Sequence, residues 1–360
     1  MLPAMKSLIV IKIGSRIVLE SLFGTSVDEA NEVIRNLFVT VHALVQSGQQ
    51  VVLVVSGAVG TGKREGVLET IQAQAARGQF ILTTKLATFA PEDMRLALLL
   101  LSREDIVNRK RYLSLQETFA ELLGAGVVPI VNENDATTIK GQNDFPDNDH
   151  LAAILSITLG ASRVFLLTDV DGVYSRHPKE IGAELYTEIA NVNKELLQAA
   201  SGKGSTISRG GMLGKLQAAR LATAAGITTH IINGNLPERI ASILKGEQFG
   251  TTCLPRTHSG VELNNRDRWL MSAKAGSGTI QLDKGAGAAV RMRKSLLAVG
   301  VQKVYGSFTA GDCVEIVDHM KETIAIGLVN QGGDALSAML TQTEKPYGVE
   351  IVHADNLILI

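Results

Sequence analysis

The chain has 360 residues, of which 45% are hydrophobic, 20% charged and 4% aromatic, and its 35 Lys and Arg nearly balance its 36 Asp and Glu. This composition is typical of a globular protein and excludes global disorder. The net charge of −1 gives no whole-chain signal for binding a polyanion. Cys253 and Cys313 are the only cysteines, and by themselves they cannot form a disulfide framework or a four-ligand zinc site.

No segment has the pattern of a membrane span or an export signal. The longest stretch without a charged side chain, residues 36–62, is interrupted at its centre by Gln46–Gln50. Each apolar half is far shorter than the ~20 residues that span a bilayer. The apolar run near the N-terminus stops at Lys12, which is too early for the core of a secretory signal. We therefore expect a cytoplasmic protein that does not associate with membranes.

Strand and helix patterns alternate along the first two thirds of the chain. We expect strands at Ser7–Ile13, Gln50–Val55, Val127–Val131, Arg163–Thr168 and Thr228–Ile232, and helices at 30–45, Leu113–Leu123, Asp149–Leu159 and Met212–Ala225. A capping box from Ser26 to Glu29 begins the first helix, and Gly48 ends it. This alternation predicts right-handed βαβ units and a mostly parallel sheet, with ligands beyond the carboxyl ends of the strands.

The pattern changes after Phe249. Residues 256–270 contain many polar residues and are predicted to be a linker. Short β-like runs separated by glycine-containing turns follow, at Thr279–Leu282, Ala298–Val304, Asp312–Val317 and Ile324–Leu328. We therefore expect an α/β domain at 1–255, the linker, and a small β-rich domain at 271–360.

Two glycine-containing motifs directly follow the first two predicted strands. In the first, Lys12 precedes Gly14, a pair suited to a phosphate-bearing ligand, although a solvated lysine before a turn is the plainer interpretation. The second, residues 56–63, nearly matches a P-loop, but Arg64 stands where Ser or Thr would hold Mg²⁺. We expect instead a glycine-rich turn whose N–H groups bind an anion, with a purely structural turn equally consistent.

Acidic and amide side chains cluster in a third motif. Residues 131–135 read VNEND after a predicted strand, and residues 147–149 read DND at a predicted helix start. Asp135 and Asn148 have no structural reason to be there and are suited to binding the ammonium and carboxylate of an amino acid. Asp149 has the alternative role of a helix N-cap. The polar loop between the two clusters has the length of a lid.

The last two motifs suggest a nucleotide site. Thr168 and Asp169 follow a predicted strand and are placed to orient a nucleotide, whereas the following Asp-Gly is only a turn signal. Residues 208–215 read SRGGMLGK and open a helix, which is typical of a phosphate site, although a helix cap with an exposed Lys215 is the alternative. No single motif is decisive, but together they mark one edge of the sheet.

In this order, the sequences IKIGS, VSGAVG, NENDA, DND, LLTDVDGVY and RGGMLGK resemble the motifs of the amino acid kinase family. The C-terminal sequences RWL, GTI, DKGA and GSF resemble those of a PUA domain. The resemblance covers nearly the whole chain and implies a three-layer αβα sandwich with a mostly parallel sheet, followed by a β-rich PUA domain. The NENDA and DND pair implies ATP-dependent phosphorylation of the side-chain carboxylate of L-glutamate to L-glutamyl 5-phosphate, the first step of proline biosynthesis.

The resemblance also implies roles for individual residues. The catalytic residues would be Lys12 on the transferred phosphoryl group, Lys215 on the phosphates, and Asp149 holding the two lysines. Ser56, Asp135 and Asn148 would bind glutamate. The nucleotide, accompanied by Mg²⁺, would contact Lys12, Gly14, Gly57, Thr168, Asp169, Arg209, Gly210, Gly211, Met212, Leu213, Gly214 and Lys215.

The chain departs from the family pattern at several positions. Arg16 replaces a serine, Arg209 and Gly214 each replace a threonine of the nucleotide loop, and residues 63–95 match poorly. Another amino acid kinase, a catalytically impaired relic with a regulatory or binding role, and a P-loop NTPase remain as alternatives. The C-terminal domain and the NENDA and DND pair argue against the first, and Arg64 argues against the last.

The resemblance further implies a homo-oligomer, either dimer or tetramer, and proline as a feedback inhibitor. Residues 271–360 hold eight Lys and Arg against nine Asp and Glu, a net charge of −1. This charge argues against strong non-specific RNA binding by the PUA domain. We expect a structural or regulatory role for it.

Overall fold

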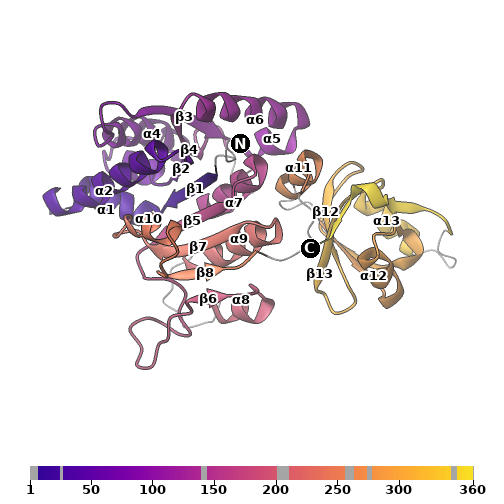
Figure 1. Ribbon diagram of the computed structural model, residues 1–360. Helices are drawn as coiled ribbons and strands as arrows, with labels where there is room; N and C mark the ends of the chain where they lie inside the picture. Colours follow the sequence, from indigo (N-terminus) through magenta and orange to yellow (C-terminus); the bar gives the residue numbers. More distant parts are fainter. Residues whose placement is uncertain are drawn as a thin grey trace, which may run out of the picture. The chain divides into compact units, whose positions relative to one another are not determined.

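The computed structural model describes residues 7–24, 27–138, 144–200, 211–255, 263–273, 278–341 and 347–359. The chain, drawn as a ribbon in Figure 1, divides into two compact units, Met1–Arg256 and Thr257–Ile360. Each unit has its own hydrophobic core. No helix within the described ranges is long and apolar enough to cross a lipid bilayer.

One large sheet forms the centre of the first unit. In spatial order its strands are β3 (Arg95–Leu101), β4 (Val127–Glu133), β2 (Gln50–Val55), β1 (Leu8–Ile13), β5 (Arg163–Thr168), β7 (Thr228–Asn233), β8 (Thr251–Cys253) and β6 (Glu188–Ile189). Neighbouring strands are parallel, except that β8 runs antiparallel to β7. The register pairs Lys12 with Val54 and Leu166, so β1, β2 and β5 end at the same edge of the sheet.

Helices cover both faces of this sheet. They are α1 (Ser15–Phe23), α2 (Val27–Gln46), α3 (Ala58–Lys63), α4 (Ile71–Ala87), α5 (Arg103–Val107), α6 (Arg109–Gly124), α7 (Asn148–Leu159), α8 (Lys194–Ala200), α9 (Met212–Ala224) and α10 (Arg239–Leu244). Helices α1, α2, α4 and α10 share one buried apolar cluster with the sheet, whereas α6, α7 and α9 contact its other face. The predicted three-layer αβα sandwich with a mostly parallel sheet is confirmed.

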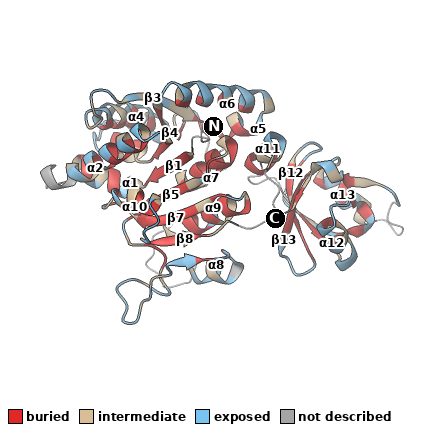
Figure 2. Cartoon of the chain, in the orientation of Figure 1, coloured by how far each residue is buried: buried red, intermediate tan, exposed pale blue. Residues whose placement is uncertain are grey.

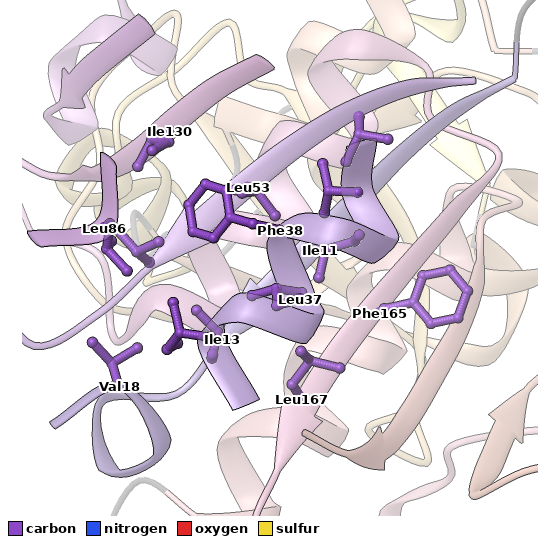
Figure 3. Close-up of a cluster of buried hydrophobic side chains, with 14 of the residues drawn as sticks. Ile11, Ile13, Val18, Leu37, Phe38, Leu53, Leu86, Ile130, Phe165 and Leu167 are labelled. Carbon is purple, nitrogen blue, oxygen red and sulfur yellow. The ribbon is translucent and has the colours of Figure 1, made fainter. Parts of the chain in front are cut away.

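The alternation of side chains along β1 decides which face its lysine joins. Ile11 and Ile13 point into the apolar cluster beneath α2, where Leu37 and Phe38 pack on them (Figure 3). Successive strand residues face opposite sides of a sheet, so Lys12 points to the face that α7 and α9 cover. The buried centre of the unit is red in Figure 2, and a charged group placed there needs partners of opposite charge.

Several elements of the first unit were not predicted, among them α1, α4 and β3. Helix α4 lies in the segment 63–95, and β3 follows it directly. The buried face of α4 carries Gln74, Gly78 and Gln79 beside its apolar residues, so the apolar spacing that reveals a helix is weak. The predicted strands and helices elsewhere in the first unit are present, with ends shifted by a few residues. The predicted capping serine, Ser26, lies outside the described residues.

The second unit is a small β-rich fold, as predicted. Its main sheet runs β11 (Val301–Tyr305), β9 (Thr279–Leu282), β12 (Cys313–Val317), β13 (Thr323–Leu328) and β15 (Leu357–Leu359), and β10 (Leu296–Leu297) pairs with β14 (Glu350–Val352). The helices are α11 (Asn265–Ala273), α12 (Lys284–Arg291) and α13 (Gly333–Leu340). Helix α11 overlaps the segment predicted as a linker, and the residue bounds proposed for the domains stay a prediction.

Candidate active site

Two lysines and one aspartate from three separate elements meet at the edge where β1 ends. Asp149, in the first turn of α7, places Oδ1 2.7 Å from Nζ of Lys12 and Oδ2 2.9 Å from Nζ of Lys215, in the first turn of α9. All three side chains are buried. One carboxylate therefore bridges two ammonium groups, and the cluster keeps an excess of positive charge that an anionic ligand would neutralise.

Burial and the opposite charges act in opposite directions on the pKa values of Lys12 and Asp149, and both values end below the ordinary ones. Burial has the largest effect on Lys12 and lowers the pKa of its ammonium below the ordinary value, although Asp149 opposes it. For Asp149, burial alone would raise the pKa of the carboxyl. The ammonium groups of Lys12 and Lys215 outweigh that effect and hold the Asp149 pKa below its ordinary value, so the carboxylate stays ionised.

The N-cap of α7 is Asp147, so the alternative interpretation of Asp149 as the cap is wrong. Asp147 Oδ1 accepts a hydrogen bond from the backbone N–H of His150 at 2.8 Å. Its other oxygen lies against α9, because a Cβ added to Gly214 would come within 2.4 Å of Asp147 Oδ2. The glycine thus admits the carboxylate of Asp147 between α7 and α9, close to Lys215.

Asn148 connects the start of α7 to the end of β2. Its Nδ2 donates to the carbonyl of Val55 at 3.0 Å, to Ser56 Oγ at 2.8 Å and to Asn132 Oδ1 at 2.8 Å. Its Oδ1 is buried and accepts no hydrogen bond from any described residue. A buried acceptor without a donor is costly, and a ligand that carries N–H groups would satisfy it.

Glycines bring two helix starts to the same edge. Gly14 is the N-cap of α1 without any side-chain cap, and a Cβ on it would lie 3.9 Å from Lys12 Nζ. The first N–H groups of α1 therefore begin beside that ammonium, as at many anion sites. Gly57 precedes α3 with a φ of 115°, a left-handed conformation that favours glycine.

The predicted glycine-rich turn at 56–63 is mostly helix. Helix α3 begins at Ala58, immediately after Gly57. Gly62, the second glycine of the near P-loop, packs against α4, because a Cβ on it would lie 1.9 Å from the carbonyl oxygen of Gln74. The spacing that imitates a P-loop therefore reflects the close crossing of two helices.

The model of the amino acid kinase family matches residues 7–233, and that of the PUA domain matches residues 278–345. The chain belongs to the amino acid kinase family. It is 38% identical to the glutamate 5-kinase of Moorella thermoacetica, over 98% of this chain and 96% of the relative. It is 37% identical to that of Nostoc punctiforme, over 99% and 100%, and 35% identical to that of Geobacter sulfurreducens, over 98% and 97%. The family inferred from the sequence motifs is confirmed.

Solved structures share the fold of the amino acid kinase unit. Two structures of N-acetylglutamate synthase from Neisseria gonorrhoeae, with TM-scores of 0.50 and 0.51, are 16% and 17% identical. Both cover 71% of this chain, and 65% and 63% of their own chains. At that identity they support the fold alone.

The nucleotide edge predicted for this amino acid kinase is partly described. Thr168 ends β5 and its hydroxyl donates to Asp169 Oδ1 at 3.2 Å, while Asp169 Oδ2 accepts from Arg16 Nη1 at 2.8 Å. Arg16, which departs from the family pattern, thus pairs with a residue predicted to contact the nucleotide. Its Nε also donates to Glu20 at 2.9 Å.

The nucleotide loop is described from Gly211 onward, and Arg209 and Gly210 lie outside the described residues. Gly211 is the N-cap of α9, and Met212, Leu213 and Gly214 form the first turn before Lys215. The alternative of an exposed Lys215 is wrong, because the side chain is buried against Asp149. Gly214 is buried too, so the missing threonine hydroxyl leaves no gap beside Asp147.

Two of the three residues predicted to bind the substrate are hydrogen-bonded to each other. Ser56 and Asn148 share a hydrogen bond of 2.8 Å. Asp135 lies in the turn after β4 and is half-buried. Sequence reasoning assigned no part to Asp147, Asn132 and Gln79, which form side-chain hydrogen bonds at this edge. Asn132 belongs to the NENDA motif, and Gln79 follows a glycine in the middle of α4, which were the available signals.

Proposed function

We propose that the chain transfers the γ-phosphoryl group of ATP to the side-chain carboxylate of L-glutamate. The observation that carries the proposal is the buried cluster of Lys12, Asp149 and Lys215, with its excess of positive charge. The glutamate 5-kinase relatives, similar over nearly their full length, support the choice of acceptor over other members of the family.

The chemistry of this reaction requires positioning and charge neutralisation. The acceptor carboxylate, with a pKa of about 4.3 in free glutamate, is already ionised at neutral pH, so no general base is needed. One carboxylate oxygen forms a bond to the γ-phosphorus while the bond from that phosphorus to the bridging oxygen of ADP breaks, and no proton moves. The obstacle is the approach of an anion to a polyanion, which the two lysines relieve.

The described residues fit this division of labour. Lys12, at the strand end beside Gly14, would contact the transferred phosphoryl group, and Lys215 the phosphates, with Asp149 fixing both ammonium groups. Thr168, Asp169 and residues 209–215 would bind the nucleotide, and Gly57 would donate its N–H. No three His, Cys, Asp or Glu side chains gather in the described part of the chain, so the accompanying Mg²⁺ would be held by phosphates and water.

On the substrate side, the unsatisfied atom of Asn148 is an acceptor. Its Nδ2 is occupied by Val55, Ser56 and Asn132, whereas Oδ1 has no donor among the described residues. Asn148 would therefore bind the α-ammonium of glutamate rather than a carboxylate. The carboxylate of Asp135 and the hydroxyl of Ser56 would complete the recognition of the amino acid.

Acyl phosphate formation tests this function. ATP and Mg²⁺ are mixed with L-glutamate, and the product is trapped with hydroxylamine as the hydroxamate. Parallel reactions contain L-aspartate, N-acetyl-L-glutamate or no acceptor. A signal with glutamate alone is expected. A signal only with another acceptor would refute the proposal, and so would the absence of any signal from protein shown to be folded.

The role of Lys215 is tested in the same assay. Lys215→Ala leaves Asp149 paired with Lys12, so the fold should persist while kcat falls by roughly 10²–10³. Lys245→Ala, at the exposed end of α10, is the matched control and should retain activity. Unchanged kcat in Lys215→Ala would remove this lysine from the catalytic machinery.

The oligomer belongs to the same proposal. Strand β3 is at the edge of the sheet, where among the described strands it pairs with β4 alone, and its sequence is RLALLLL. Leu98 is 43% exposed on it, and Phe80 of α4 is 66% exposed. A long apolar edge strand left uncovered invites association, and a second copy of the chain is the occupant that a homo-oligomer would supply. Proline inhibition and cytoplasmic location complete the proposal.

A further inference from the structure

Three side-chain amides form a continuous hydrogen-bonded chain from the middle of α4 to the substrate site. Asn132 Nδ2 donates to Gln79 Oε1 at 2.7 Å, and Asn148 Nδ2 donates to Asn132 Oδ1 at 2.8 Å. Gln79 and Asn132 are only 7% and 1% exposed. The chain continues outward, because Gln79 Nε2 donates to Thr83 Oγ1 at 3.0 Å.

Backbone groups fix the direction of this chain at two points. The backbone N–H of Glu133 donates to Asn132 Oδ1 at 2.9 Å, so that atom must be the oxygen of the amide. The carbonyl of Val55 accepts from Asn148 at 3.0 Å, so that atom must be the nitrogen. The remaining atom of Asn148, the one without a partner among the described residues, is therefore an oxygen.

Gln79 supplies an acceptor that holds Asn132 from the far side. Without it, the Asn132 NH₂ group would be buried and unsatisfied, which costs free energy. The Asn132 amide would then be held only through its oxygen, and its hydrogen bond to Asn148 would be less precisely placed. The Asn148 amide would keep its direction, set by Val55, but lose part of the contact that positions its oxygen.

A close helix crossing places Gln79 in the interior. A Cβ added to the preceding residue, Gly78, would lie 1.8 Å from the carbonyl oxygen of Ala58 in α3. The missing side chain lets the backbone of α4 touch α3, and this contact brings the polar face of α4 to the end of β4. Without the glycine, the glutamine side chain would not reach Asn132.

We propose that Gln79 is a positioning residue that makes the active site selective for an acceptor bearing an ammonium group. It acts through Asn132 and holds Asn148 with its oxygen turned toward the ligand. This role rests on the proposed phosphorylation of L-glutamate. The new element is that the preference for L-glutamate over a dicarboxylate without an amino group depends on Gln79 in α4. Two amide side chains, those of Asn132 and Asn148, separate Gln79 from the substrate.

The experiment compares L-glutamate with glutarate, which lacks the α-ammonium, in the hydroxamate assay. Gln79→Met keeps the length of the side chain and removes the amide. Gln79→Glu keeps an acceptor for Asn132, with the Thr83 hydroxyl free to donate to it. Gln74→Met is the matched control, because Gln74 is a buried glutamine of the same helix that donates at 2.7 Å to the carbonyl of Leu68, away from the site.

Gln79→Met is expected to raise the KM for L-glutamate roughly tenfold and to reduce the preference for glutamate over glutarate by a similar factor. The KM for ATP should stay unchanged, and Gln79→Glu should restore the preference. If Gln79→Met does not fold, Thr83→Val, which loosens Gln79 from outside, should shift the same ratio less. A ratio unchanged in every folded Gln79 and Thr83 variant, or changed equally in Gln74→Met, would overturn the inference.

The two proposals fail differently. Wild-type protein that phosphorylates neither glutamate nor glutarate would contradict the proposed function itself. Wild-type protein that prefers glutamate, with variants that keep this preference, would contradict only the role of Gln79.

Discussion

A single carboxylate organises the charged residues of the active site. Asp149 bridges Lys12 and Lys215 at 2.7 and 2.9 Å in a buried position. Burying ions costs more than one ion pair returns unless their hydrogen bonds are satisfied. Two ammonium groups on one carboxylate remain incompletely neutralised, and bound phosphates would complete the balance. The arrangement that would serve the proposed ligand binding is thus not the one that maximises stability.

A buried histidine outside the site makes stability depend on pH. His230, in β7, is 3% exposed, stacks on Phe165 with ring centroids 4.7 Å apart, and contacts Thr252 Oγ1 at 3.1 Å. Burial is the main cause that lowers its pKa from 6.5 to about 4, and Arg163 adds to the effect. The imidazole is therefore neutral in the folded protein at pH values where the unfolded chain binds a proton.

The sign of the pH dependence follows. The stability that depends on neutral His230 is fully present above pH 6.5 and is lost as the pH falls to about 4. The lowering from 6.5 to about 4 corresponds to about 3 kcal/mol of unfolding free energy. Urea unfolding between pH 7 and 4 measures it. His230→Phe, which cannot titrate, should show a smaller loss over this range, and an equal loss in both proteins would contradict the assignment.

Helices α7 and α9 approach each other through one glycine. A Cβ on Gly214 would come within 2.4 Å of Asp147 Oδ2, so this element contact excludes a side chain. Gly→Ala inside a helix ordinarily stabilises by about 0.5–1 kcal/mol. Gly214→Ala should instead destabilise the protein, because the added methyl group displaces the carboxylate of Asp147. It should also lower kcat, because this carboxylate lies beside the turn that carries Lys215. Denaturant unfolding and the hydroxamate assay measure the two effects.

Gly124, at the end of α6, is the matched glycine. Nothing stands within 4 Å of a Cβ placed there, so Gly124→Ala should stabilise the protein and leave kcat unchanged. Stabilisation of the protein by Gly214→Ala, with full activity, would show that Asp147 moves aside without consequence.

At the scale of the whole molecule, the apolar edge at β3 bears on assembly. Leu98 is 43% exposed on an edge strand, where a lysine blocks pairing with another strand. Leu98→Lys should therefore reduce the mass of the particle in solution, measured by light scattering after size-exclusion chromatography. The control is Ile181→Lys, at a side chain that is 99% exposed elsewhere. Equal masses for the wild type and Leu98→Lys would contradict a role of this edge in assembly.

Both successes and failures of prediction at this scale have a physical cause. The buried strands and α7 carry continuous apolar runs that stand out in the sequence. Helix α4 escaped prediction because Gln74, Gly78 and Gln79 occupy its buried face, where apolar residues are usual. The residue bounds of the two domains and the proposed role of Arg209 stay predictions, the latter because that residue lies outside the described chain.

The sequence by itself determined the layered α/β fold, the β-rich second unit and the edge where Lys12, Asn148 and Asp149 gather. Local patterns carry these features, since strand ends, helix caps and apolar periods depend on neighbours in the chain. The family resemblance already implied that Asp149 holds both lysines, but only the tertiary structure decided the distances of that contact, that Asp147 is the cap lying against Gly214, and that Gln79 reaches Asn132. Those contacts join elements far apart in the sequence, and their distances depend on packing that no local pattern encodes.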